Sequence, residues 1–431
     1  MHDSKNDLRM MTRVIKSSGG FLKMLEKMKS YIEPNRTVRN IMIVVLCLLI
    51  GGVCGSFFIG FSRMHADFGD IHKAGTVEME RNFDEEDYDE ESTVCDVTYE
   101  NGDAYMVVSY SYEEYEQLED DSITAYAYTT DSGETLYFDH ADPTMEQAQA
   151  AYQAYMADEM MPVFNFGISL LILFLSVGTV FLFSKAFTTY EKSWFLTIMV
   201  LATIAAVAFP EESANGVNGI VIMLLYLLDT FLNILCELLI SKQSRYNFLV
   251  SVLVEITEIA ICLVLMYRFA TMATTLFFWL PIDILSYINW SKHKDDESEE
   301  LTAVRRLKGY QEVLVITAIV VWTVVVGYFL SGLDIQTDFF GGNKSLETAI
   351  VYIDACASAV GVANGLFIFF RLREQWIAWY ICALLESVIN IMSGQYVLLV
   401  LKLGYFTNTT YGYIKWSRYI RSHAEEKKSL F

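Results

Sequence analysis

Three kinds of residue pattern are missing from this sequence, and each absence excludes a class of protein. No Cys-x-x-Cys spacing occurs, and six of the seven cysteines stand within or at the ends of apolar segments, which leaves Cys95 alone in an acidic region. A disulfide framework within one copy of that region is therefore excluded, as are the common cysteine metal spacings. Basic residues number 31 against 53 acidic ones, so there is no basic surface for nucleic acid. No segment presents a nucleophile–base pair or a metal set, and we expect neither an enzyme nor a bound cofactor.

Long apolar runs dominate what is present. Apolar residues make up 53% of the chain despite a net charge of −22. Apolar runs of roughly 18 residues or more, the length that a helix needs to cross a bilayer, recur along the sequence. They predict an all-α polytopic membrane protein with ten transmembrane helices, at about residues 40–61, 162–184, 193–210, 219–241, 246–268, 270–290, 312–332, 347–370, 376–393 and 395–416.

The acidity is confined to one insert between the first two spans. Residues 62–159 contain 27 acidic side chains against three basic ones, and the rest of the chain is nearly neutral. We therefore divide the chain into a basic N-terminus, a first span, an acidic soluble domain, a second span, a transport domain and a tail, at residues 1–39, 40–61, 62–160, 161–185, 190–420 and 421–431.

The charges of the loops predict the orientation in the membrane. Lysine and arginine collect in alternate loops, with Arg268 as the one exception, so the positive-inside rule makes both termini cytoplasmic and places residues 62–160 outside a plasma membrane. The basic N-terminus has two interpretations, a helix lying on anionic lipid or a solvated flank that sets topology, and we favour the flank.

Within the insert, alternating polar and apolar residues predict strands. Thr93–Glu100 and Ala104–Tyr112 flank an Asn-Gly turn, and Ile123–Thr130 and Thr135–Asp139 form a second hairpin. A four-stranded sheet followed by a helix at 144–160 is expected, with the run 84–91 disordered or solvated. Its tyrosines either line a ligand surface or form a packed face, and packing is favoured. They are Tyr105, Tyr110, Tyr112, Tyr126, Tyr128 and Tyr137.

A repeated sequence pattern organises the transport domain. The block around Trp290 recurs around Trp416, 126 positions later, and Arg245 and Arg371 have the same offset. Two groups of three helices joined by one linker helix follow from this pattern. The odd number of linker helices makes the repeat parallel, an architecture of carriers whose substrate site lies where the repeats meet.

Polar residues inside the predicted spans point to that site. Asp283 stands two residues after Pro281, which is expected to break its helix, and acids outnumber bases in the spans, so a cationic or polar solute is favoured. Trp376 and Trp379 share one helix face beside Arg371–Glu374. The alternative for these tryptophans is an interfacial belt.

The sequence also resembles a known family. The run Leu276–Ile282, the Arg-x-Arg-Glu-Gln-Trp-x-x-Trp of 371–379 and the closing Gly412–Trp416 are similar to the nicotinamide riboside/mononucleotide transporter (PnuC) family over about residues 190–420. The resemblance implies a 3+1+3, SWEET-like fold, tryptophans stacked on a flat ring, and facilitated uptake of a vitamin precursor for NAD biosynthesis, trapped by intracellular phosphorylation. Ala383 replaces an expected Asn (or Asp) and Asp283 an expected Gln, so thiamine and riboflavin stay open as substrates.

We therefore expect a carrier with its site between the helix groups. The predicted substrate-binding residues are Trp376, Trp379, Trp279, Asp283, Glu386, Asn408, Asp354 and Asn390. The expected partners are a cationic or polar aromatic vitamin precursor and the lipid bilayer, with homo-oligomer formation left open. A membrane receptor that binds its ligand through the outer β domain is the alternative of another class.

Overall fold

The computed structural model describes residues 32, 35–89, 94–115, 117–118, 121–211, 217–265, 268–292, 304, 306–332 and 344–429. The predicted basic stretch before residue 32 and most of the predicted outer loop at 334–344 lie outside this part. The chain divides into two compact units, Cys54–Gly167 and Met1–Val53 with Ile168–Phe431. Each unit has its own clusters of buried apolar side chains.

The described helices include nine that are long and apolar enough to cross a membrane. Three precede the transport domain: α2 (Arg36–Met64), α4 (Met145–Leu182) and α5 (Thr189–Ala208). These spans make the chain a multi-pass helical membrane protein. The predicted tenth span, 395–416, is helical as part of α13 (Tyr396–Ser429) but is not among the nine. Its Lys402, Asn408 and neighbouring threonines lower its hydropathy.

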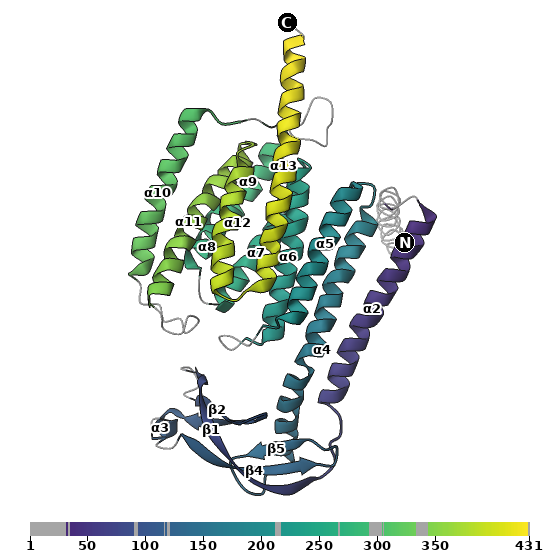
Figure 1. Cartoon of the computed structure of the whole chain (residues 1–431), viewed down its shortest axis with the longest axis vertical. Coiled ribbons are helices and arrows are strands. Elements are labelled where there is room, and N and C mark those ends of the chain that lie inside the picture. Colours follow the sequence, from purple (N-terminus) through teal and green to yellow (C-terminus); the bar gives the residue numbers. More distant parts are fainter. Residues whose placement is uncertain are drawn as a thin grey trace, which may run out of the picture. The chain divides into compact units, whose positions relative to one another are not determined.

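The helices from α6 onward form a bundle of two packed groups. The helices in order are α6 (Gly219–Ser241), α7 (Asn247–Leu265), α8 (Phe269–Thr274), η1 (Thr275–Trp279), α9 (Leu280–Lys292), α10 (Gly309–Ser331), α11 (Lys344–Phe369), α12 (Gln375–Met392) and α13. In the first group α6 packs on α7, and in the second α11 packs on α12. Between the groups, α13 packs on α6, and α11 packs on α8 and α9, while α10 contacts α11 (Figure 1).

The connection between the first and second helices has the same backbone geometry in both groups. Gln243 after α6 and Arg371 after α11 both have a φ of 59°. Each is followed by a residue whose N–H donates to a carbonyl five positions back, Ser244 to Leu239 and Leu372 to Phe367. This is the Schellman arrangement, which satisfies the last carbonyls of a helix. The two groups thus enter their second helices through equivalent turns.

A π-helical turn, η1, leads into Pro281. Proline lacks an N–H and its ring clashes with the carbonyl four residues earlier in an α-helix. The chain avoids this clash by widening over Thr275–Trp279, and the Leu280 N–H donates to the Thr275 carbonyl. Pro281 is the second residue of α9, so the regular α-helix is interrupted by the π turn just before the proline and resumes through it to Lys292. The turn positions Trp279 at its end.

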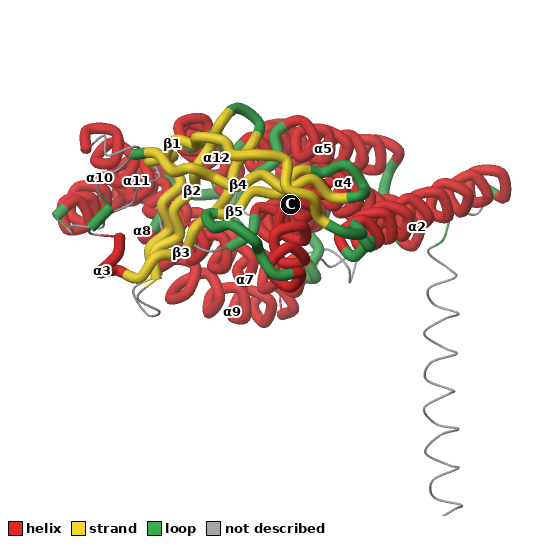
Figure 2. The backbone as a smooth tube through the Cα atoms, turned by 90° about the horizontal axis from the view of Figure 1, so that it is seen from below, coloured by secondary structure: helices red, strands yellow, loops and turns green. Residues whose placement is uncertain are grey.

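The other unit is built on a five-stranded antiparallel sheet of order β3-β2-β1-β4-β5. Its strands are β1 (Ile71–Asp89), β2 (Val94–Asn101), β3 (Ala104–Ser111), β4 (Ser122–Thr130) and β5 (Thr135–Phe138), with the short helix α3 (Tyr112–Tyr115) after β3. The outermost strands, β3 and β5, contact each other, so the sheet curls on itself (Figure 2). The Asp70 N–H, with His72, donates to Asp131 beside β4 and lowers the pKa of that carboxyl.

Both predicted hairpins are present, as β2–β3 and β4–β5, but the sheet has a fifth strand that was not expected. β1 is its central strand: residues 71–80 pair with β4 and residues 80–89 pair with β2. It includes 84–89, part of the acidic run, and residues 86–89 are held there by pairing with β2 alone, beyond an irregularity between Arg81 and Glu86. The expected helix at 144–160 and the second span are one helix, α4.

Two apolar clusters stabilise this unit. One joins Phe68, Tyr128 and Phe138 to Tyr152 and Met156 of α4. The other lies inside the curled sheet around Met79, Val97 and Tyr99, with Tyr110 and Tyr137 packed against it. Tyr110, Tyr126, Tyr128 and Tyr137 therefore contribute to packing, and Tyr105 donates to Asp158 of α4.

Candidate substrate-binding site

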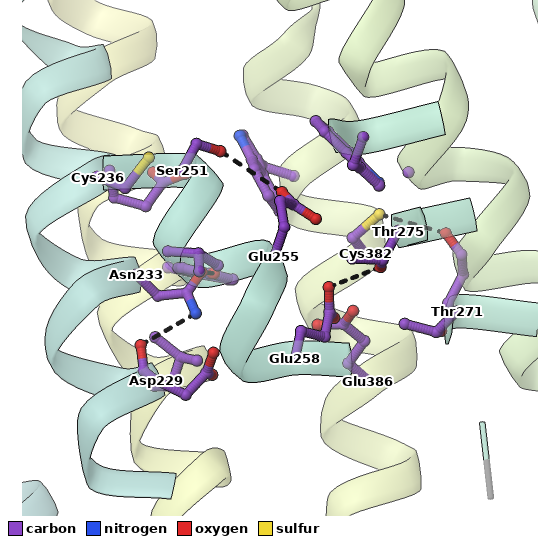
Figure 3. A pocket seen from close by; sticks show the side chains of 18 of the residues that line it. Asp229, Asn233, Cys236, Ser251, Glu255, Glu258, Thr271, Thr275, Cys382 and Glu386 are labelled. Carbon is purple, nitrogen blue, oxygen red and sulfur yellow. Dashed lines mark hydrogen bonds between the residues drawn. The ribbon is translucent and has the colours of Figure 1, made fainter. Parts of the chain in front are cut away.

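A cavity lies inside the helical bundle, with walls from α6, α7, α8, η1, α9, α11, α12 and α13 (Figure 3). Its volume is about 100 Å³, several times the roughly 10–15 Å³ that one water molecule needs. Six acids and two bases line it. The acids are Asp229, Glu237, Glu255, Glu258, Asp283 and Glu386, and the bases are Arg268 and Lys402. The cavity therefore has room for more than one water molecule, and its titratable side chains are predominantly acidic.

Two parallel indoles form the aromatic side of the cavity. Trp279 at the end of η1 and Trp379 on α12 have ring centroids 6.4 Å apart and planes inclined by 17°. The ring of Tyr405 lies 5.1 Å from that of Trp379. With the Asn364 amide oriented to satisfy its neighbours, its oxygen accepts from Trp379 Nε1 at 3.2 Å and its nitrogen donates to the Gln375 carbonyl. This bond fixes the orientation of the Trp379 indole.

The Trp279 indole fits against a glycine face of α11. A Cβ at Gly365 would lie 2.5 Å from Phe278 and 3.3 Å from Trp279, and one at Gly361 would lie 3.7 Å from the indole nitrogen. A side chain at Gly365 would displace the Phe278 ring and press on the Trp279 indole, whereas a Cβ at Gly361 would only touch it. The two glycines of α11 therefore leave room for the Trp279 indole.

A chain of buried charges ties the start of α8 to α12 and α13. Arg268, with a φ of 59°, precedes α8, and its guanidinium lies 3.9 Å from Asp354 and 3.3 Å from Glu386. Lys402 forms an ion pair with the other oxygen of Glu386. Asp354 also accepts from the N–H groups of Ala270 and Thr271 at the first turn of α8. Both bases of the cavity are thus engaged by acids.

The acids on the first helix group have neutral neighbours instead. Thr257 donates to Asp229 at 2.8 Å, Thr275 to Glu258 at 2.9 Å and Asn408 to Glu237 at 3.0 Å. Glu255 and Asp283 each keep one oxygen without a hydrogen-bond partner. This half of the cavity therefore carries uncompensated acceptors.

The predicted residues occupy three kinds of position. The cavity lining includes Trp279, Trp379, Asp283, Glu386 and Asn390. Asp354 and Asn408 do not line the cavity but bond to Arg268 and Glu237, which do.

Trp376 packs beside the cavity in a group of four rings. Phe248 and Trp290 meet edge to face at 5.1 Å, and Trp376 and Trp416 do so at 5.6 Å. Trp290 and Trp416 join the pairs at 6.1 Å, and all three tryptophans are fully buried. Phe248 also lines the cavity. The rings therefore pack where the two helix groups meet, next to the cavity.

A substitution at Gly412 tests this packing. Its added Cβ would lie 2.5 Å from Trp376, and such overpacking typically costs about 1–3 kcal/mol, which outweighs the roughly 1 kcal/mol that alanine gains over glycine in a helix. We expect Gly412→Ala to lower the melting temperature of the purified protein. Gly55→Ala is the control because nothing lies within 4 Å of its Cβ, and it should not lower the melting temperature. Equal effects of the two changes would contradict the packing.

Sequence reasoning did not assign Arg268, Tyr405 and Asn364 to the site. Arg268 carried a signal, because it was the exception to the loop-charge pattern, and its burial between Asp354 and Glu386 explains the exception. Asn364 lies inside an apolar span with no local pattern that marks it, and its role depends on where Trp379 lies.

Comparison with known proteins gives matches to one group of transporters. Residues 223–418 match the family model described as nicotinamide mononucleotide transporter. The nicotinamide riboside transporter PnuC of Neisseria mucosa is 24% identical over 247 residues, covering 55% of this chain and 84% of that protein. The one of Haemophilus influenzae is 22% identical over 242 residues, covering 56% and 94%.

A solved structure described as the vitamin B3 transporter PnuC aligns with a TM-score of 0.43 at 21% identity, covering 55% of this chain and 94% of that one. All of the cavity-lining residues, from Asp229 to Tyr405, fall inside the segment that the family model matches. The acidic insert lies outside that segment.

Proposed function

We infer that the chain, over about residues 190–420, belongs to the nicotinamide riboside/mononucleotide transporter (PnuC) family. We propose that it carries nicotinamide riboside, or a similar flat vitamin precursor, across the membrane by facilitated diffusion. The proteins of this family are transporters rather than enzymes. The observation that carries the proposal is the parallel pair Trp279–Trp379 in an acid-lined cavity.

The spacing of the indoles supports insertion of a flat ring between them. A ring with carbon contacts of about 3.5–4.0 Å on each side needs the indole planes roughly 7–8 Å apart. The centroids lie 6.4 Å apart, so the planes are no further apart than that, and the pair would have to open by roughly 1 Å or more to admit the ring. A desolvated cation over an indole face gains about 2 kcal/mol, which favours an electron-poor pyridinium ring.

The charges favour the riboside over the mononucleotide. Arg268 and Lys402, the bases in the cavity, are engaged by Asp354 and Glu386. A phosphate would meet unpaired carboxylates and no free cation. The substrate is therefore a cation without a phosphate, and phosphorylation after entry would prevent its return.

The other predicted residues have supporting roles in this proposal. Glu386 and Asn390 provide polar contacts at the end of the cavity away from Trp379. Asp354 holds the start of α8, and Asn408 orients Glu237. We assign Trp376 to the packing that holds α12 rather than to the ring of the substrate.

We propose that transport uses the two helix groups as a parallel 3+1+3 repeat with α10 as the linker and α13 as the tenth span. The equivalent turns at Gln243 and Arg371 support this arrangement, as do the edge-to-face pairs Phe248–Trp290 and Trp376–Trp416. Rocking of one group against the other would expose the cavity to each side in turn. Loop charges support cytoplasmic termini and an outer position for the acidic unit in a plasma membrane.

Uptake into proteoliposomes tests the proposal. We expect saturable uptake of labelled nicotinamide riboside that stops at equal inner and outer concentrations, needs no ion gradient, and is competed by unlabelled riboside but not by the mononucleotide. Enclosing a nicotinamide riboside kinase with ATP should raise accumulation above that limit. Stronger competition by thiamine or riboflavin would reassign the substrate, and no flux of any of these compounds would favour a receptor.

A further inference from the structure

One face of α7 presents a row of polar side chains to the cavity. Asn247, Ser251 and Glu255 follow one another at intervals of four residues and all line the cavity, as expected for neighbours on one helix face. The neighbouring helix α6 contacts the start of this row, where the Cys236 thiol donates to the Asn247 carbonyl. Figure 3 shows Ser251 above Glu255, joined to it by a hydrogen bond of 3.5 Å.

Asp283 completes this group from the third helix. It stands four residues after Trp279, so helix geometry puts it on the same face and about 6 Å further along the axis. The Asp283 and Glu255 carboxyl groups are close enough to interact electrostatically, and the Ser251 hydroxyl is a hydrogen-bonding neighbour of both. A group attached to a ring held by Trp279 and directed along α9 would therefore reach Asp283 and Glu255.

These side chains are buried with hydrogen-bonding atoms unused. Glu255 Oε2, Asp283 Oδ2 and both amide atoms of Asn247 have no partner, at exposures of 5%, 2% and 1%. A buried polar group without a partner is destabilising, and native proteins leave few of them unexplained. The Asn247 amide is a second observation besides the two acids. Because it leaves both a donor and an acceptor unused, a ligand that satisfies this group has to both donate and accept hydrogen bonds.

The opposite wall has the complementary chemistry. Asn247 and Gln375, the first residues of α7 and α12, stand 128 positions apart. At the same offset α12 has Trp379 and Ala383 where α7 has Ser251 and Glu255. At the level of Ser251 and Trp379 the cavity is thus polar on α7 and aromatic on α12, while Glu386 and Asn390 line it further along α12. A ligand that fills it has a flat face and, joined to it, a part rich in hydrogen-bonding groups.

We propose that Glu255 and Asp283, with Ser251 and Asn247, are the subsite for a hydroxyl-bearing group, a vicinal diol such as that of ribose, joined to the stacked ring. Paired carboxylate oxygens accept from neighbouring hydroxyls, as acidic residues do from ribose in dinucleotide-binding folds. The Asn247 amide and Ser251 hydroxyl bond the oxygens of the same group. This inference rests on the proposed function and deepens it, because it makes the sugar a determinant of specificity.

The test compares two cations that share a ring and differ in the sugar. Nicotinamide riboside has the ribose, and 1-methylnicotinamide has only a methyl group in its place. Binding of each to the purified full-length protein is measured by calorimetry for wild type, Asp283→Asn and Glu255→Gln. Glu312→Gln, in the exposed first turn of α10, is the control for loss of an acid elsewhere. Melting temperatures establish that each variant is folded.

We expect Asp283→Asn and Glu255→Gln each to weaken riboside binding about tenfold or more, the scale of a lost hydrogen bond to a charged group. Binding of 1-methylnicotinamide should stay within about twofold of wild type, and Glu312→Gln should change neither affinity. An equal loss of affinity for both compounds would overturn the proposal, since the acids would then interact with the charge of the ring and not with the sugar. Unchanged riboside binding in both variants would overturn it as well.

The same design separates this inference from the proposed function. If wild type binds neither nicotinamide compound, the nicotinamide assignment fails, and the comparison is repeated with riboflavin and lumichrome, the same ring with and without its hydroxylated chain. A selective loss of riboflavin binding in the two variants would support the subsite. An equal loss of both, or no binding of either compound to wild type, would overturn it.

Discussion

Replacing Trp379 by alanine is expected to lower uptake of nicotinamide riboside more than any other single change in the aromatic part of the cavity. The substitution removes one of the two indole faces that would hold the ring. A loss of about 2 kcal/mol of cation–π energy corresponds to roughly a 30-fold loss of affinity. Trp379→Phe keeps a smaller aromatic face and should lose less. Initial uptake rates in proteoliposomes, corrected for the amount of folded protein, measure the effect.

Trp322 provides the matched control for this prediction. It is a tryptophan of α10 that is 41% exposed and does not line the cavity. Trp322→Ala should therefore keep uptake close to that of wild type. Equal loss in both variants would show that tryptophan removal acts through stability, and wild-type uptake by Trp379→Ala would remove this indole from the site.

Replacing Arg268 by methionine is expected to cause the largest loss of stability in the transport domain. Its guanidinium, buried between Asp354 and Glu386, is a cation that both acids share. Removing one partner of a buried ion pair typically costs about 3–5 kcal/mol, because the remaining charge stays buried. Asp354 also holds the first turn of α8, so the change should loosen the helix that leads to Trp279. Thermal unfolding in detergent measures the loss.

A double variant identifies the cause of that loss. Arg268→Met combined with Glu386→Gln removes both the cation and one of the acids that it stabilises, and should unfold at a higher temperature than Arg268→Met alone. Arg306→Met, at an exposed position before α10, should match wild type. An Arg268→Met protein as stable as wild type, or a double variant no better than the single one, would contradict the charge chain.

The elements that sequence alone predicted well are those with strong local patterns. Apolar runs as long as a bilayer gave the helices of the transport domain, and the Asn-Gly turn at Asn101 gave the β2–β3 hairpin. β1 was missed because acidic residues 84–89 carry no strand pattern, and its partners β2 and β4 are what hold it. Its existence depends on pairing across the sheet, which local sequence does not encode.

The candidate site was predictable in composition but not in geometry. Residues three apart on a helix lie on nearly the same face, so the spacing of Trp376 and Trp379 could not tell which one points into the cavity. The rotation of α12 decides it, through the Asn364 contact to Trp379 and the ring of Trp416 against Trp376. The pairing of Trp279 with Trp379 depends on the glycine face of α11 and the π turn, both visible only in three dimensions.

The most direct test of the central claim is an experimental structure of the full-length protein with nicotinamide riboside bound. We expect the pyridinium ring between the indoles of Trp279 and Trp379, with their ring centroids more than 6.4 Å apart. A riboside bound outside this cavity, or a ring that touches neither indole, would contradict it.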